Sequence, residues 1–403
     1  MCKKLLVLIV LLVTAMVQGQ QNRLSPEAEI SVLTVGPGTA LNDAFGHSAF
    51  RIKDPIKGID LVFNYGVYDF QTPHFYLKFA QGKLNYLIGL DYYEDFYESY
   101  VSQNRTIKAQ GLNLSPSEKQ GLFAYLLHNY KPENRAYLYE FFFDNCATRI
   151  RDVVEETTQN DITFNPPDGF KAKTFRQLIH DHVSLNSWGA VGIDVALGSV
   201  IDRKASAYEH MFLPENIYRF FNTATFASNP DKPLVKQSRV LFEKLEVPPS
   251  STFFTSPLFV FGLIGLLILF ITYKDFKNTR RTPWIDVVLF SVTGVIGVFI
   301  LLLWFATDHT GTHQNYNVLW AFALNLLVIP QLIKTKPAKW FQKYLKFLII
   351  LWCLLTLHWI IGVQVFAVAL IPLFVAIACR YVFLVDYYAR METRDNSESG
   401  TPL

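Results

Sequence analysis

The sequence predicts an α+β domain exported from the cytoplasm, followed by an all-α membrane domain of five helices. Three observations predict this arrangement: a basic and then apolar N-terminus, a long middle segment of mixed strand-like and helix-like periodicity, and five apolar stretches near the C-terminus. The predicted parts are a signal peptide (1–19), the exported domain (20–230), a linker (231–256), the membrane domain (257–390) and a cytoplasmic tail (391–403).

The first nineteen residues, "MCKKLLVLIVLLVTAMVQG", have the organisation of a secretory signal peptide. Lys3 and Lys4 form the positive start, residues 5–13 form the apolar run, and small residues lead to a cut after Gly19. Cys2 precedes the apolar run, so it is not a lipid-attachment cysteine and is removed with the signal. An uncleaved anchor helix is the alternative, but the apolar run is short for that role. Export of the following domain is therefore expected.

The C-terminal third contains the predicted membrane helices, since about 20 mostly apolar residues span a bilayer. The stretches are 257–273, 284–307, 316–333, 344–361 and 365–385. The first and third connecting loops, "YKDFKNTRRTP" and "IKTKPAKWFQKY", are rich in Lys and Arg, whereas "TDHTGTHQNYN" between them has neither. Because basic loops stay in the cytoplasm, this alternation places the segment before the first helix outside and the C-terminus inside. The signal peptide leads to the same topology independently.

Charge and composition exclude one class of function. The chain has 37 Lys and Arg against 34 Asp and Glu, a formal net charge of +3. The basic loops of the membrane domain explain this small excess, so a nucleic-acid partner is not expected.

The exported domain contains a single cysteine, Cys146, because Cys353 and Cys379 lie in the predicted membrane helices. One cysteine cannot form an internal disulfide, and a free thiol outside the cytoplasm is unusual. A buried cysteine acting as a small apolar residue is the alternative to a reactive one. Its local sequence therefore has to decide between the two.

The local sequence places Cys146 in the first turn of a helix that follows a strand. Upstream, Ser115 and Glu118 form a capping box for a helix starting at Pro116, and the aromatic run 135–143 is strand-like. "DNCATRIRDVVEETTQ" then has an apolar stripe at helical spacing. The free amides at a helix N-terminus stabilise a thiolate and can bind an oxyanion. This position favours a nucleophilic cysteine.

A nucleophilic thiol needs a base, and His47 is the strongest candidate. "DAFGHSAFRIKDPIKGIDLVFNYG" predicts two strands joined by the turn "DPIKG", with His47 opening the first strand after Gly46. A symmetric turn places Tyr65 opposite His47 and Asn64 opposite Ser48, and either can orient the imidazole. The other histidines of the domain fit solvated, packing or loop positions: His74, His128, His180, His182 and His210.

These residues resemble a known family. "GHSAFR" on a strand followed by "NCATR" opening a helix is similar to the circularly permuted NlpC/P60 arrangement, in which His precedes Cys. More specifically, the chain resembles the bacterial lipoprotein N-acyltransferases of the Lnb type. The stretches that carry this resemblance are "DAFGHSAFRIKDP", "IDLVFNYGVYDF", "FYLKFAQGKLNYLIG", "YEFFFDNCATRIRD", "DVALGSVIDRKASAYEHMFLP" and "WFATDHTGTHQNYNVLW".

The resemblance implies a papain-like, permuted NlpC/P60-like periplasmic domain on a multi-pass protein of the bacterial inner membrane. It implies an acyltransferase without a cofactor, which moves an acyl chain from a phospholipid to the α-amino group of the diacylglyceryl-modified N-terminal cysteine of lipoproteins. Cys146 matches the family nucleophile and His47 the family base. The partners are then the bilayer, a phospholipid donor and diacylated lipoproteins.

Further residues are accessory candidates on chemical grounds. The amides of Asn145 and Cys146 can bind an oxyanion, Arg149 can meet a lipid phosphate, and Asp43 lies in the same stretch as His47. In the outer loop, Asp308, His309 and His313 are candidates for contact with a head group or lipoprotein, or for docking of the exported domain. We predict no metal site there, because one loop is a weak scaffold for ligands.

Two alternatives remain open from the sequence. One is a membrane-tethered Cys–His peptidase or amidase acting on the cell wall, which shares the chemistry as far as the acyl-enzyme. Five membrane helices exceed what a tether needs, which favours the acyltransferase. The other is a non-catalytic lipoprotein-handling membrane protein in which Cys146 is structural.

Overall fold

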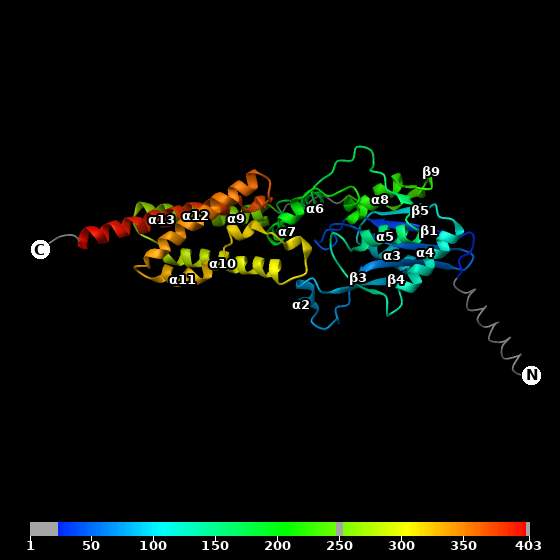
Figure 1. Cartoon of the computed structure of the whole chain (residues 1–403), viewed down its shortest axis with the longest axis horizontal. Coiled ribbons are helices and arrows are strands. Elements are labelled where there is room, and N and C mark those ends of the chain that lie inside the picture. The colour runs from blue at the N-terminus through cyan, green and yellow to red at the C-terminus, as the bar shows by residue number, and fades with distance from the viewer. Residues whose placement is uncertain (1–22, 247–252, 400–403) are drawn as a thin grey trace, which may run out of the picture. The chain divides into compact units, whose positions relative to one another are not determined.

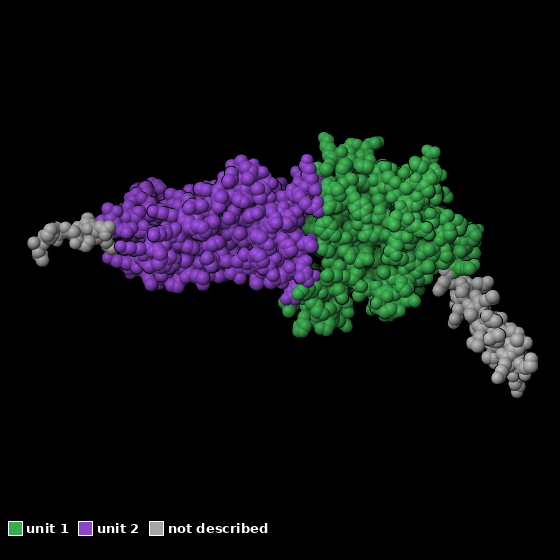
Figure 2. Space-filling view, viewed as in Figure 1, with its two compact units in different colours: residues 1–79, 83–172, 205–247 green, residues 80–82, 173–204, 248–403 purple. Residues whose placement is uncertain are grey.

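The computed structural model describes residues 23–246 and 253–399 (Figure 1). The predicted signal peptide, residues 247–252 of the predicted linker and residues 400–403 of the predicted tail lie outside the described residues. The described chain forms two compact units (Figure 2): unit 1 holds residues 23–79, 83–172 and 205–246, and unit 2 holds 80–82, 173–204 and 253–399. Part of the predicted exported domain, residues 173–204, therefore belongs to the same unit as the apolar C-terminal helices.

Unit 1 is built on a seven-stranded sheet in the order β10-β5-β1-β2-β3-β4-β6, with every neighbouring pair antiparallel. Its strands are β1 Glu29–Val35, β2 His47–Asp54, β3 Ile59–Val67, β4 Asn85–Tyr92, β5 Ile107–Leu112, β6 Ala136–Leu138 and β10 Val235–Phe242. A second, three-stranded sheet holds β7 Ile162–Thr163, β8 Thr225–Phe226 and β9 Asn229–Pro233. The mixed α/β character predicted for the exported part is confirmed.

Helices cover both faces of the large sheet. The helices of unit 1 are α2 Phe75–Ala80, α3 Tyr93–Ser102, α4 Pro116–Asn129, α5 Cys146–Thr157, the 3-10 helix η2 Glu209–Phe212, and α8 Pro214–Thr223. Alternate strand residues such as Phe50 and Phe63 pack with α4, α5 and α8 in one core, while Ala49 and Val62 pack with α3 in another. The alternation along each strand follows from the two-residue period of side chains in a sheet.

The sequence signals at two helix starts are confirmed. Ser115 caps α4, accepting from the N–H of Glu118, whose carboxylate accepts from the N–H of Ser115 at 2.6 Å. Helix α5 begins at Cys146, as predicted. The aromatic run 135–143 is strand only over Ala136–Leu138 and then turns back through a bridge between Glu140 and Asp144. This turn leads the chain directly into the first residue of α5.

The predicted linker 231–256 is wrong over its first half. Strand β10 pairs with β5 along the edge of the large sheet, and β9 pairs with β8. The alternating "VKQSRVLF" fits an edge strand with one exposed face. Its partner, β5, lies more than 120 residues earlier in the chain, and no local signal indicates such a pairing. The polar composition of the stretch therefore led to the interpretation as a linker.

Unit 2 is helical. Its helices are α6 Phe175–His180, α7 Trp188–Ala196, α9 Pro257–Lys277, α10 Pro283–Phe305, α11 Asn325–Ile333, α12 Lys339–Ile360 and α13 Ile371–Ser399, with the 3-10 helices η1 Ser199–Asp202, η3 Phe253–Thr255, η4 Thr310–Thr312, η5 Tyr316–Leu319 and η6 Val368–Leu370. Among the described residues, four helices are long and apolar enough to span a membrane: Pro257–Lys277, Pro283–Phe305, Lys339–Ile360 and Val368–Thr393. They correspond to four of the five predicted spans. Helix α13 continues through residues 391–399 of the predicted tail.

The third predicted span, 316–333, is not one continuous helix. It is divided into η5 and α11, and the nine residues of α11 cover only about 14 Å of the roughly 30 Å of hydrocarbon. Buried asparagines explain the break, because Asn317 bonds the indole of Trp320 and Asn325 bonds the hydroxyl of Thr293 on α10. A Cβ on Gly297 of α10 would lie 2.1 Å from the carbonyl oxygen of Ala321. This non-helical backbone is thus packed closely against protein, as backbone at membrane depth must be.

Candidate active site

The side chain of Asn145 fixes the position of Cys146 at the start of α5. Its Oδ1 accepts from the N–H groups of Ala147 at 2.8 Å and Thr148 at 2.9 Å. Its Nδ2 donates to the carbonyls of Phe141 and Phe212, at 2.7 and 2.8 Å. Asn145 is buried, and each of these bonds restricts where the first turn can lie.

Asn145 is therefore not an oxyanion donor, contrary to one of the two amide roles expected from the sequence. Its backbone N–H donates to Thr148 Oγ1 at 2.8 Å, and both side-chain N–H groups are occupied. By contrast, none of the described residues accepts a hydrogen bond from the backbone N–H of Cys146. The amide of Cys146 is the free donor at this helix end.

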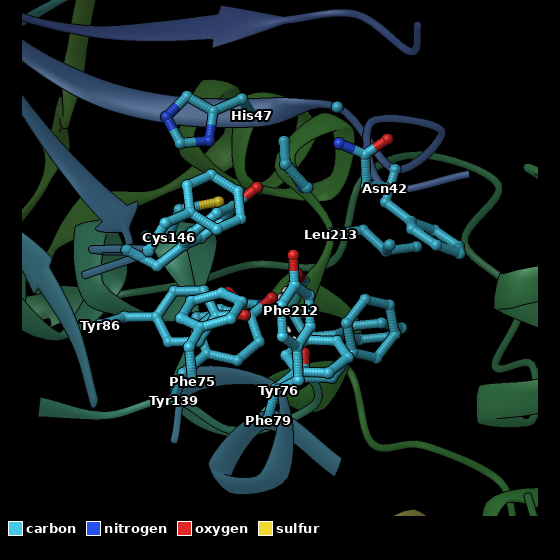
Figure 3. A pocket seen from close by; sticks show the side chains of 18 residues that line it. Asn42, His47, Phe75, Tyr76, Phe79, Tyr86, Tyr139, Cys146, Phe212 and Leu213 are labelled. Carbon is cyan, nitrogen blue, oxygen red and sulfur yellow. Dashed lines mark hydrogen bonds between the residues drawn. The ribbon is translucent and has the colours of Figure 1, made fainter. Parts of the chain in front are cut away.

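His47 opens β2, as predicted, and contacts Cys146. Gly46 precedes it at a φ of +82°, and a Cβ there would lie 2.6 Å from the carbonyl oxygen of Val35, so only glycine fits. The Nε2–H of His47 donates to Asn64 Oδ1, which leaves Nδ1 for the thiol, and Cys146 is hydrogen-bonded to the imidazole. Figure 3 shows the sulfur facing the ring at one end of a pocket. The three side chains have the order of a nucleophile, base and orienting group.

The predicted hairpin register is wrong by one residue, and the correction separates Asn64 from Tyr65. In the structure Phe50 pairs with Phe63 and Arg51 with Val62. Continuing this register by one residue places Asn64 opposite Ala49. Asn64 therefore shares the face of His47, whereas Tyr65 points into the core on the opposite face and donates from its hydroxyl to Asn129 at 3.1 Å. A one-residue slip exchanges the two faces of a strand. Asn64 is the residue bonded to the imidazole, and Tyr65 is part of the core.

Gly66 is a site residue that sequence reasoning missed. Its φ is +97°, and a Cβ would lie 3.7 Å from Cys146 Cβ and 4.0 Å from His47 Cε1. The register of β3 against β4 shifts between Tyr65 and Val67, so Gly66 lies at a bulge. The glycine in "NYG" is the available sequence signal, because glycine inside a strand often marks a bulge or a close backbone approach.

The electrostatics of the pair favour a thiolate and an imidazolium. Burial alone raises the pKa of the Cys146 thiol, but the charge and hydrogen bond of His47, with the N–H groups of Ser48 and Ala147, outweigh burial and hold that pKa below its ordinary value. Burial likewise lowers the pKa of His47, and the charge of Cys146 and the bonds to Cys146 and Asn64 reverse this, so the pKa is raised. Each group stabilises the charged form of the other.

A buried charged group lies behind the imidazole. The ring of Tyr100 stacks on His47 with centroids 6.2 Å apart, and the guanidinium of Arg105 lies 4.9 Å from the Tyr100 centroid. Arg105 approaches Asp43 at 3.9 Å, which places this accessory candidate beside the site. The carbonyl of Asp43 also accepts from the N–H of Gly46 at 3.1 Å. Asp43 thus holds the loop that delivers His47, and it is not among the residues bonded to the imidazole.

Arg149 is occupied by a neighbour within its own unit. Its Nη2 donates to Asp144 Oδ2 at 2.6 Å, and its guanidinium lies 4.4 Å from the ring centroid of Tyr137. It does not line the pocket beside the thiol. The predicted contact with a lipid phosphate would require Arg149 to leave Asp144.

An aromatic pocket of about 360 Å³ opens beside the thiol (Figure 3). Aromatic rings form most of its wall: Phe45, Tyr68, Phe70, Phe75, Tyr76, Phe79, Tyr86, Tyr139, Phe141 and Phe212. Only Phe141 and Tyr139 are close in sequence to Cys146, so the sequence gives aromatic richness but not which rings meet. A wall of this kind takes an apolar ligand and excludes water from the reacting atoms.

The outer loop predicted to contact substrate makes backbone bonds inside unit 2. The N–H of Asp308 donates to Gln81 at 2.8 Å, and the N–H of Gly198 donates to Gly311 at 2.9 Å. His313 lies against Gly198, whose Cβ would overlap the His313 carbonyl. Among the described residues, no group of three or more His, Cys, Asp or Glu is arranged to hold a metal. Contact of Asp308, His309 and His313 with a head group or lipoprotein stays a prediction.

The fold and the site define a class: an α/β domain carrying a Cys–His–Asn constellation, on the same chain as apolar helices long enough to span a membrane. Comparison with protein families identifies the particular family. Residues 19–181 match the family model described as the Lnb N-terminal periplasmic domain, and residues 249–391 match the Lnb transmembrane domain. The chain belongs to the Lnb family. No curated protein and no solved structure matches it.

Proposed function

We propose that the protein is a lipoprotein N-acyltransferase that carries the acyl chain as a thioester on Cys146. The observation that supports this most strongly is the junction of two features: the Cys146–His47–Asn64 constellation and the aromatic pocket that begins at the same sulfur. The proposed donor is a membrane phospholipid. The proposed acceptor is the α-amino group of the diacylglyceryl-cysteine at the N-terminus of a lipoprotein.

In the first half-reaction, His47 holds the thiol proton and the Cys146 sulfur attacks an ester carbonyl of the phospholipid. The oxyanion that forms accepts a hydrogen bond from the free N–H of Cys146 at the start of α5. The intermediate collapses by breaking the ester C–O bond, and the departing oxygen takes the proton from His47. A lysophospholipid leaves, and the acyl chain remains on sulfur.

In the second half-reaction, the neutral amine of the lipoprotein attacks the thioester carbonyl. His47, now uncharged, accepts a proton from the attacking nitrogen, and the C–S bond breaks to release the thiolate of Cys146. The product is an amide, which is more stable than the thioester, so transfer to the amine runs downhill. Asn64 keeps the imidazole in one orientation through both halves.

The fold of unit 1 supports a relationship to the papain-like and permuted NlpC/P60-like enzymes, in which a helix starting at the nucleophile packs on an antiparallel sheet bearing the base. In this chain α5 starts at Cys146 and packs against β2, which His47 opens. The proposed location is the bacterial inner membrane with five membrane segments, the interrupted segment 316–333 being the third. The basic loops then face the cytoplasm, and so does the C-terminus.

Mass spectrometry of lipoprotein N-terminal peptides tests the proposal. A strain lacking the gene is expected to lose the third acyl chain, and the chain is restored by the wild-type gene but not by Cys146→Ala. Cys353→Ala is the matched control, because Cys353 is an exposed thiol on α12. Full triacylation by Cys146→Ala would refute the thioester route. Intact triacylation with altered cell-wall peptides would instead favour a peptidase or amidase.

A further inference from the structure

The segment from the end of β3 to α2, residues 67–79, exposes an unusual amount of apolar surface; we refer to it as the lip. Tyr76 is 78% exposed, Leu77 57% and Phe70 65%. Phe75 is the one buried side chain of α2. Rings of the lip pack on one another, with centroids 5.0 Å apart for Tyr68 and Phe70 and 4.9 Å apart for Phe70 and Phe75. The lip is thus one continuous patch, of the kind that marks an interaction site.

The lip has two sides with different surroundings. Tyr68, Phe70, Phe75, Tyr76 and Phe79 line the pocket that begins at Cys146, so the inner side of the lip is a wall of that pocket (Figure 3). Leu77 does not line the pocket and is exposed. An apolar ligand in the pocket therefore passes the same segment that presents apolar side chains outward.

The chain connects the lip directly to a segment that is bonded close to the end of a membrane helix. The lip is followed directly by residues 80–82, which belong to unit 2, where the carbonyl of Gln81 accepts from the N–H of Asp308. Asp308 is three residues beyond Phe305, the last residue of α10, which is long and apolar enough to span a membrane. The last residue of the lip, Phe79, is therefore two residues before Gln81, which is bonded to a residue just beyond the end of α10.

The chemistry of the lip fits a lipid surface. Tyr and Phe are the amphipathic and apolar aromatic residues that collect at the boundary between head groups and hydrocarbon. Across residues 67–79 the formal charges are one Asp and one Lys, so little charge opposes insertion. Three side chains of this short helix, Tyr76, Leu77 and Phe79, are largely exposed, and burying them in the interfacial layer is favourable.

We propose that the lip inserts into the outer surface of the bilayer and forms the passage by which an acyl chain moves from the membrane into the pocket. The identity of the passenger rests on the proposed function, whereas insertion of the lip does not. A lipoprotein peptide or a second copy of the chain on the same patch is the competing occupant, and the experiments below separate them.

The first experiment measures insertion without using activity. A small fluorescent amino acid replaces Leu77 in the full-length protein, reconstituted in phosphatidylethanolamine–phosphatidylglycerol vesicles with or without brominated acyl chains. The matched control carries the same residue at Ile56, an aliphatic position 69% exposed in the turn at the far end of β2 from His47. Brominated lipid is expected to quench position 77 by at least twofold and to leave position 56 unchanged. Equal quenching at both positions would overturn the proposal, as would quenching at neither.

The second experiment links the lip to substrate entry. Leu77→Asp is expected to raise the apparent KM for vesicle phospholipid several-fold, with kcat and the alkylation rate of Cys146 by iodoacetamide unchanged. Ile56→Asp is expected to change none of these values. A fall in kcat at unchanged KM would contradict a role in entry. If the wild-type protein transfers no acyl chain, the proposed function fails while the quenching result still decides whether the lip inserts.

Discussion

Removal of His47 tests the electrostatic account of the site most directly. In His47→Ala the thiol of Cys146 loses the charge and the hydrogen bond that lower its pKa, while burial, which raises it, remains. The N–H groups of Ser48 and Ala147 also remain, so the pKa of the thiol rises toward its ordinary value of 9.0. At pH 7 a thiol with that pKa is about 1% ionised. The variant is therefore expected to hold its sulfur almost entirely as thiol.

The size of the effect follows from two opposing changes. His47 makes the thiol more acidic. Each tenfold increase in acidity raises the fraction of thiolate at pH 7 by up to about tenfold, which corresponds to about 1.4 kcal/mol. The same increase in acidity lowers the intrinsic nucleophilicity of the thiolate by about threefold. Wild-type Cys146 should thus be alkylated about threefold faster than the variant at pH 7 for each such tenfold increase. Above the pKa of the variant the order reverses, because both thiols are ionised and the more basic thiolate reacts faster.

The assay is the rate of iodoacetamide alkylation between pH 5 and 10, in a background with Cys2, Cys353 and Cys379 replaced by serine. The two rate profiles are expected to cross, with His47→Ala slower at pH 7 and faster near pH 10. His128→Ala is the control, since His128 bonds Asn134 at the end of α4 and leaves the thiol untouched. Parallel profiles for His47→Ala and the wild type would refute the ion pair.

Three further predictions concern the same site. The profile of kcat/KM against pH is expected to be bell-shaped, because the pKa of each group is moved in the direction that favours the charged pair. The rising limb is the ionisation of Cys146, below the ordinary thiol pKa of 9.0, and the falling limb is the loss of the His47 proton, above the ordinary imidazole pKa of 6.5. A single limb in steady-state assays would contradict this prediction. Asn64→Ala is expected to lower kcat by at least about tenfold with KM little changed, because the imidazole loses the acceptor that orients it; unchanged kcat would remove Asn64 from the site. Ser115→Ala deletes a helix cap and should destabilise by about 1 kcal/mol, measured by thermal unfolding of the detergent-solubilised protein. Asn145→Ala deletes a cap and also two hydrogen bonds to the carbonyls of Phe141 and Phe212, so it should destabilise more. Only Asn145→Ala is expected to lower activity also, and equal activity loss in both would mean that the loss comes from capping alone.

The local parts of the site were predictable because their signals lie within a few residues. Ser115 with Glu118 marks one helix start, and the cap-type residue Asn145 before an apolar stripe marks another, which places Cys146 in a first turn. Gly46 before an alternating run likewise marks the start of β2 at His47. None of these assignments needs a contact between distant parts of the chain.

The identity of the third residue depended on one detail of hairpin geometry. A symmetric turn over "DPIKG" leaves Asp54 unpaired, whereas in the structure Asp54 pairs with Ile59 across a four-residue loop. That single extra pair moves Asn64 onto the face of His47 and turns Tyr65 into the core. Since turn length fixes register and register fixes faces, a one-residue error was enough to leave the two candidates undecided.

The prediction of one continuous helix over 316–333 is wrong, because polar residues in that segment are satisfied by tertiary contacts. Hydropathy averages over a window, so the apolar residues of 316–333 concealed Asn317 and Asn325. In the structure these amides bond to Trp320 and to Thr293 and Tyr344, which only the folded chain brings together. The backbone of the interrupted segment at Ala321 packs against Gly297 of α10, so it is covered by protein there and not exposed to lipid.

The arrangement of charge around the thiol bears on whether water or an amine resolves the acyl-enzyme. A thioester beside a catalytic base is hydrolysed quickly only if a water can reach it, and the pocket wall beside Cys146 is largely aromatic. His47 and the N–H groups of Ser48 and Ala147 are hydrogen-bonded to the thiol, and His47 and Ala147 are also bonded to Asn64 and Asn145. A peptidase needs a polar groove to bind a cell-wall peptide and a water poised for attack, whereas an acyl chain in this pocket fills the space such a water would occupy. Under the proposed function, the amine arrives attached to a lipid-bearing peptide, and we expect it to be the nucleophile that reaches the thioester along this wall.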